Sequence, residues 1–154
     1  MDITYLADHK EVIPMLAQWF YQEWAYLHPD RTLDDIERLI AERTNIDKIP
    51  VALVAFVGDE LVGTVCLKTH DMDTRPELSP WLAGLYVSKP RRCRSIGAEL
   101  VSAIEKKAHE LGVGNLYLYT PKSEGFYSRL GWNVNERTEY HGYPVTIMEK
   151  KIVL

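Results

Sequence analysis

The chain has 154 residues, of which 46% are hydrophobic and 26% charged, and its formal net charge is −4. We expect one globular domain spanning residues 1–154, and the acidic balance disfavours general nucleic-acid binding. No apolar run approaches the roughly 20 residues that span a bilayer, and the N-terminus lacks the pattern of a signal peptide, so no membrane association is expected. Two cysteines, Cys66 and Cys93, make no disulfide framework. We therefore expect a cytoplasmic protein.

The N-terminal third predicts one short strand followed by two helices. Residues 3–6 read as the strand. Asp8 with Glu11 predicts a capping box for a helix that runs towards residue 26, and Thr32 with Asp35 predicts a second capping box for a helix through about residue 43. Both helices therefore precede the main run of strands.

The centre of the chain predicts a hairpin and then a loop. The apolar run Val51–Val57 is typical of a strand that is covered on both faces. Gly58 and Asp59 form a turn that connects it to a second strand over residues 60–68. The polar segment 69–80 contains two prolines and is expected to be a loop.

The segment 81–113 carries the most information. An apolar strand ends before Pro90, because proline cannot donate to a sheet ladder. Four cations crowd the turn that follows, and apolar side chains then recur at helical spacing. The cations are Lys89, Arg91, Arg92 and Arg94, and the helix face is Ile96, Leu100, Val101, Ile104, Ala108 and Leu111. The first turn of a helix has unpaired N–H groups, so this junction suits a phosphate.

The C-terminal third adds a strand over 115–120, a short helix near 124–130, and strands near 133–140 and 145–153. Gly112 or Gly114 ends the preceding helix. The complete order, β-α-α-β-β-β-α-β-α-β-β, predicts an α/β (α+β) protein with a mixed sheet and helices on both faces.

Two motifs together resemble the GNAT superfamily of acyl-CoA-dependent N-acyltransferases. The first is the strand, the turn PRRCRSIGA and the helix; the second is GFYSRLGW, residues 125–132. The family's pyrophosphate loop falls on Arg92, Cys93, Arg94, Ser95, Ile96 and Gly97, with Ala98 following. Ser95 stands where the family usually has glycine, and Cys93 where a further glycine is common. The resemblance implies a mostly antiparallel sheet of about seven strands, and it makes a homodimer plausible.

The resemblance also implies a reaction, in which a primary amine of a small molecule or peptide attacks the thioester of acetyl-CoA directly. Residues 92–98 would hold the diphosphate, and backbone N–H groups of Leu85, Tyr86 and Val87 would hold the pantetheine arm and polarise the carbonyl. Gly84 would ease the necessary bulge. Tyr127, in FYxxxGW, would be the general acid that protonates the leaving thiolate. The histidines and cysteines do not have the sequence spacing that is typical of metal ligands, so no metal is expected.

Several assignments stay open at this stage. The aromatic run from Trp19 to Tyr26 is either a wall of the substrate site or ordinary packing of a helix on a sheet. Cys93 is either a reactive thiol or a small substitute for glycine. The general base has five weak candidates: Asp71, Asp73, Glu77, His70 and His141. The alternative function is a catalytically weak acyl-CoA sensor or interaction domain of the same fold, which the departure at Ser95 motivates.

Overall fold

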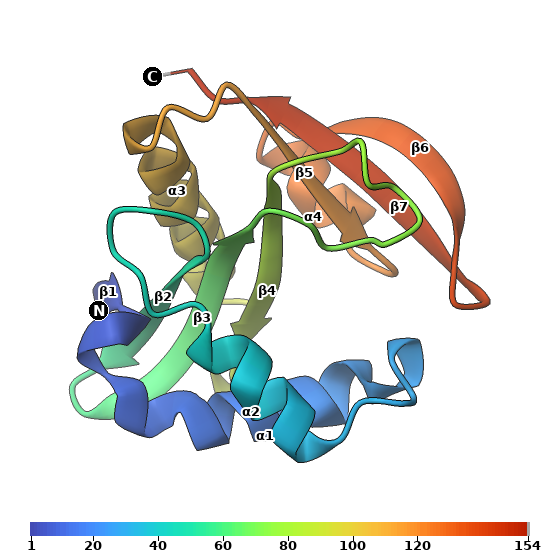
Figure 1. The fold of residues 1–154 in the computed structure, drawn as a ribbon. Helices are drawn as coiled ribbons and strands as arrows, with labels where there is room; N and C mark the ends of the chain where they lie inside the picture. The colour runs from blue at the N-terminus through green and yellow to red at the C-terminus, as the bar shows by residue number, and fades with distance from the viewer. Residues whose placement is uncertain (154) are drawn as a thin grey trace.

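A seven-stranded sheet forms the centre of the computed structural model, which describes residues 1–153 (Figure 1). The spatial order is β1-β2-β3-β4-β5-β7-β6, and β4 with β5 is the one parallel pair in this sheet. The strands are β1 (Asp2–Tyr5), β2 (Val51–Val57), β3 (Glu60–Lys68), β4 (Trp81–Val87), β5 (Asn115–Thr120), β6 (Asn133–Tyr140) and β7 (Tyr143–Lys151). The predicted mostly antiparallel sheet is confirmed, as is the order of the elements along the chain.

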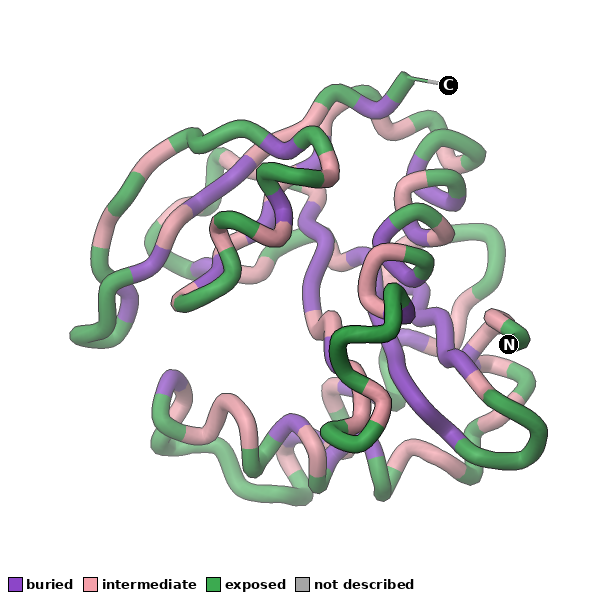
Figure 2. The backbone as a smooth tube through the Cα atoms, turned by 180° about the vertical axis from the view of Figure 1, so that it is seen from behind, coloured by how far each residue is buried: buried purple, intermediate pink, exposed green. Residues whose placement is uncertain are grey.

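Helices cover both faces of the sheet, as predicted (Figure 1). The helices α1 (Ile13–Trp24) and α2 (Leu33–Ala41) pack with one apolar cluster, and α3 (Ile96–Glu110) and α4 (Glu124–Arg129) pack with another. The first five residues of β2 are buried, which fits a strand covered on both faces. Figure 2 shows the buried positions concentrated on the central strands and on the inner sides of the helices.

One of the two predicted capping boxes is present and the other is wrong. Thr32 Oγ1 accepts from the N–H of Asp35, and the Asp35 carboxylate accepts from the N–H of Thr32. Asp8 and Glu11 instead lie in two short 3₁₀ turns, and α1 begins at Ile13 without a side-chain cap. Pro14 lies in the first turn of α1, where its missing N–H costs no intrahelical hydrogen bond.

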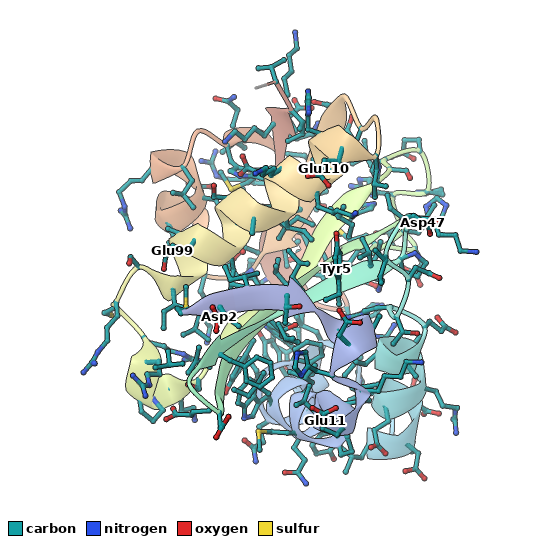
Figure 3. All side chains as sticks on the ribbon, turned by 90° about the vertical axis from the view of Figure 1, so that its left-hand side faces the viewer. Asp2, Tyr5, Glu11, Asp47, Glu99 and Glu110 are labelled. Atoms are coloured by element: carbon teal, nitrogen blue, oxygen red, sulfur yellow. The ribbon has the colours of Figure 1, made fainter. Side chains whose placement is uncertain are left out.

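The helix α3 is fixed at its C-terminal end by a glycine cap and by β1. Gly112 has a φ of +81°, and the N–H of Val113 donates to Ala108 O at 2.9 Å, which is the Schellman arrangement. Lys107 Nζ donates to the hydroxyl of Tyr5 at 3.0 Å. Figure 3 shows Tyr5 beside the half of α3 that ends at Glu110. These contacts hold α3 so that its N-terminus lies at the end of β4.

Gly63 of β3 allows α3 to lie close to the sheet. A Cβ atom at this position would be 2.8 Å from Leu100 Cδ1 of α3 and 3.0 Å from the backbone oxygen of Tyr86. Leu100 is fully buried, so its side chain has little room to move aside. The approach of α3 to the sheet therefore depends on the absence of a side chain at residue 63.

We expect Gly63→Ala to lower the free energy of unfolding by about 1–3 kcal/mol, because it overpacks the contact between α3 and β3. The measurement is urea unfolding followed by circular dichroism. Gly114→Ala is the matched control, since a Cβ there meets nothing within 4 Å, and it should change stability by less than about 0.5 kcal/mol. Equal stabilities for the two variants would contradict this account of the packing.

Candidate active site

The strands β4 and β5 separate almost as soon as they meet (Figure 1). They are in register only at Trp81 and Tyr117, where the N–H of Tyr117 also donates to Pro80 O at 3.1 Å. The N–H of Ser88 donates to Val62 O of β3, so the alternation along the strand turns the N–H groups of Leu85 and Val87 away from β3. These two groups therefore face the opening between the diverging strands, whereas the N–H of Tyr86 faces β3.

Gly84 produces the predicted bulge in β4. Its φ is +61°, and the pairing with β3 shifts register between Thr64 and Cys66, so that Val65 stands opposite two residues. The bulge lies at the point where β4 bends away from β5. Glycine is the residue that adopts this backbone conformation without steric cost.

The turn between β4 and α3 contains two residues in the left-handed conformation. Cys93 has a φ of +64° and Ser95 a φ of +63°, and α3 begins at the next residue, Ile96. These are the two positions at which the resemblance leads us to expect glycine, and the positive φ values give the physical reason. Backbone N–H groups at the start of the helix, over residues 96–98, point out of the helix end towards any ligand in this turn.

The three arginines of the turn have different surroundings. Arg91 is bound through two hydrogen bonds to Glu60, at 2.9 and 3.1 Å. Arg92 turns back towards the sheet, where its Nε donates to Val87 O at 2.9 Å and a guanidinium nitrogen lies 3.7 Å from the Glu23 carboxylate. Arg94 is exposed and has no ion-pair partner among residues 1–153. Arg94 is therefore the arginine of this turn that is available to a ligand.

Tyr127 lies in the short helix α4, which packs closely on the start of α3. A Cβ at Gly97 would lie 3.3 Å from the Phe126 ring, so the glycine permits this approach. The Tyr127 side chain is 7% exposed and borders the cleft described next. Burial raises the pKa of its phenol well above the ordinary value of 10. The phenol is therefore protonated at neutral pH and can act as a proton donor.

A cleft of about 470 Å³ extends from the opening between β4 and β5 to the ends of α1 and α2. Its walls include Leu82–Leu85 of β4, Leu118–Thr120 of β5, Tyr127 of α4 and the aromatic side chains Phe20, Trp24 and Tyr26. The cleft thus brings together two regions that are far apart in the sequence, the diverging strand with Leu85 and the helix with Tyr127.

The aromatic run from Trp19 to Tyr26, at the end of α1 and just after it, has side chains in two kinds of surroundings. Phe20, Trp24 and Tyr26 border the cleft, whereas Trp19 stacks on the ring of Tyr86 with a centroid distance of 4.9 Å. Tyr21 is exposed. Some rings of this segment therefore face the cleft and others pack on the sheet, and its role as a wall of the substrate site stays a prediction.

Of the five candidate bases, one borders the cleft. Asp71 borders it and accepts a hydrogen bond from Lys68 Nζ at 3.1 Å. The other four candidates, His70, Asp73, Glu77 and His141, are not among the residues that form its walls. The ring of His141 hydrogen-bonds to Leu27 O and so ties the β6–β7 turn to the segment after α1.

Sequence reasoning did not identify two residues of the cleft wall, His28 and Arg43. The ring of His28 lies 5.4 Å from the ring of His141, and its pKa is lowered to about 4, first by burial and then by Arg31. Arg43 follows the end of α2, and its guanidinium reaches Gly84 of β4. Neither residue belongs to a local motif, so only the folded arrangement identifies them.

Comparisons with known proteins agree with this architecture. The model of the acetyltransferase (GNAT) family matches residues 13–132. The structure of an aminoglycoside 6'-N-acetyltransferase complexed with coenzyme A has a TM-score of 0.77 at 21% identity, covering 100% of this chain and 98% of that one. An aminoglycoside 6'-acetyltransferase type Ii gives 0.76 at 24% identity, with 100% and 99% covered. The aminoglycoside 6'-N-acetyltransferase from Enterococcus faecium gives 0.74 at 21% identity, with 100% and 98% covered.

A comparison with curated protein sequences gives no match. Among residues 1–153, no helix has both the length and the apolar character that crossing a membrane requires.

The lowered pKa of His28 predicts a pH dependence of stability. The pKa is about 4 in the folded protein, against roughly 6.5 in an unfolded chain. Between these values the unfolded chain binds more protons, so the free energy of unfolding falls as the pH is lowered from about 6.5 to about 4. We expect His28→Gln to reduce this fall, measured by urea unfolding at pH 7 and pH 5. His70→Gln removes an exposed imidazole as a control, and a pH dependence unchanged by His28→Gln would contradict the assignment.

Proposed function

The chain belongs to the acetyltransferase (GNAT) family, whose members are acetyl-CoA-dependent N-acetyltransferases, and we propose that it transfers an acetyl group to a primary amine by direct attack. The observation that carries this proposal is the separation of β4 from β5, which leaves strand amides facing a cleft that Tyr127 borders. A protein that only packed this sheet would gain from pairing the two strands along their length.

The residues around the opening fit acetyl-CoA. The amides of Ile96, Gly97 and Ala98 form the start of α3, and the positive-φ residues Cys93 and Ser95 shape the turn before it. We assign the diphosphate to this turn, with Arg94 supplying a free positive charge and Arg92 bracing the turn against Val87 O. Bound there, acetyl-CoA supplies the acetyl thioester and a thiolate leaving group.

The strand amides of Leu85 and Val87 are assigned to the pantetheine arm and the acyl carbonyl. Their N–H groups face the opening, so they can donate without breaking the ladder with β3. Fixed donors of this kind stabilise the negative charge that develops on the carbonyl oxygen, and removal of one such donor in other enzymes costs on the order of 3 kcal/mol. The Tyr86 ring contacts both the Trp19 ring and the Arg92 guanidinium.

Tyr127 is assigned as the general acid. A phenol of ordinary pKa is already protonated at neutral pH, so it can give its proton to the departing sulfur. Uptake of the amine's proton falls to other groups that border the cleft. The neutral imidazole of His28 and the carboxylate of Asp71 both border the cleft and both can accept a proton, directly or through water.

A catalytically weak acyl-CoA sensor of the same fold is the second candidate function. The left-handed conformations of Cys93 and Ser95 favour it, because a side chain at these positions occupies space that glycine leaves to the phosphates.

Two further features stay predictions: a cytoplasmic location, to which the free cysteines Cys66 and Cys93 are suited, and a homodimer.

We expect Tyr127→Phe to lower kcat by about 10²- to 10⁴-fold, because the leaving thiolate loses its proton donor. The measurement is thiol release from acetyl-CoA across a panel of primary amines, together with calorimetric titration of CoA. The dissociation constant for CoA should change little, since the hydroxyl acts on the sulfur during the reaction and not on the distant phosphates.

Tyr117→Phe is the matched control. It also removes a phenol hydroxyl, one that accepts a hydrogen bond from Asn115 Nδ2, and it does not border the cleft. Turnover by Tyr127→Phe at the rate of Tyr117→Phe would contradict the role of Tyr127. Binding of CoA without turnover of any amine would favour the sensor, and tighter binding of ATP than of CoA would contradict both functions.

A further inference from the structure

A largely buried arginine that has no counter-ion borders the cleft. The side chain of Arg43 is 9% exposed, and residues 1–153 provide it with neither a salt bridge nor a side-chain hydrogen bond. The guanidinium makes a cation–π contact with the ring of Phe20, with 5.7 Å between the guanidinium carbon and the ring centroid. The guanidinium nitrogens of Arg43 are not among the buried polar atoms without a partner, so they meet the solvent of the cleft. An unpaired arginine held in such a wall is placed to form a charge-assisted pair with an anionic ligand.

The backbone around Arg43 fixes where this charge lies. The N–H of Arg43 donates to Ile40 O at the end of α2, and its C=O accepts from the N–H of Ala52 in β2. The side chain then crosses to β4, where Nη1 lies 3.1 Å from the position that a Cβ of Gly84 would occupy. Gly84 thus leaves room for the guanidinium, one residue before the Leu85 amide to which we assign the acyl carbonyl.

The rest of the cleft is also short of negative charge. Two carboxylates border it, and each already has a cation: Asp71 has Lys68 at 3.1 Å, and Glu23 has Arg92 at 3.7 Å. Arg31 and Lys122, which also border the cleft, have no carboxylate partner among residues 1–153. The cleft therefore presents a surplus of positive charge to its ligand.

We propose that the amine substrate carries a carboxylate and that Arg43 binds it, which makes the substrate a compact amino acid rather than a polycation. This proposal rests on the proposed function. The position of Arg43 beside Gly84 places the carboxylate close to the acyl carbonyl, so the amine must be only a few bonds away from the carboxylate. Phe20, Trp24 and Tyr26 provide apolar surface for the remainder of the molecule. Aminoglycosides, the substrates named for the structural neighbours, carry several positive charges, which this cleft repels.

The test compares matched amines that differ only in the carboxylate. Alanine, leucine and phenylalanine are each offered as the free acid and as the primary amide, and kcat/KM is measured by thiol release from acetyl-CoA. The amide has the less basic amine, so chemistry alone favours it. For each amino acid that the enzyme acetylates, we expect kcat/KM to be at least about tenfold higher for the acid than for the amide. The reason is that the amide cannot form the charge-assisted pair with the guanidinium.

Arg43→Gln should reduce this preference to within about twofold, and Arg43→Lys, which keeps the charge but loses the fork, should give an intermediate value. Arg38→Gln is the matched control: it removes a positive charge from α2, the helix that ends just before Arg43, where Arg38 pairs with Asp35 away from the cleft. It should keep the preference of the wild type. Circular dichroism and thermal unfolding establish that each variant is folded before kinetics are read.

A binding measurement keeps this proposal distinguishable from the proposed function. Fluorescence of the tryptophans, of which Trp24 borders the cleft, reports binding of N-acetyl-phenylalanine and of its amide to the CoA-saturated protein. Tighter binding of the acid, lost in Arg43→Gln, supports the proposal even if no amine turns over. Equal binding of acid and amide, or a preference that survives in Arg43→Gln, overturns it. A uniform fall in kcat for acids and amides alike in Arg43→Gln also overturns it, since Arg43 would then act on the acyl group.

Discussion

The separation of β4 from β5 is the constraint on which the site depends. Two parallel strands that share one registered pair leave backbone donors without partners in the sheet, so the fold forgoes the hydrogen bonds of a full ladder. The fold accepts this cost at one place, between a bulge at Gly84 and the start of α3. The same divergence opens the cleft that Tyr127 borders, and the packing of α4 on the start of α3 at Gly97 brings the phenol to it.

The turn before α3 shows how the chain tolerates departures from glycine. Cys93 and Ser95 both have positive φ, a conformation that costs a side-chain-bearing residue roughly 1–2 kcal/mol. The surrounding contacts hold the backbone in place, with Arg91 fixed to Glu60 and Arg92 fixed to Val87 O. Two of the four cations that mark this turn in the sequence therefore stabilise its shape, and Lys89 and Arg94 remain exposed.

Local signals predicted most of the fold, and contacts between distant segments account for the rest. Thr32 and Asp35 form their capping box because the helix begins directly after them, whereas Asp8 and Glu11 do not, because the chain makes 3₁₀ turns there before α1. The sequence located the basic turn and Tyr127 through motifs, and Gly84 through its place in the strand. It did not locate Arg43 or His28, whose surroundings come from β4, Phe20 and the β6–β7 turn and not from neighbours in the sequence.

The most direct test of this account is a crystal structure of the protein with CoA. We predict that the diphosphate lies within hydrogen-bonding distance of the amides of residues 96–98, and that the pantetheine arm runs along the Leu85 and Val87 amides with its sulfur beside Tyr127. Coenzyme bound elsewhere on the molecule, or β5 closed onto β4 with those amides paired in the sheet, would contradict it.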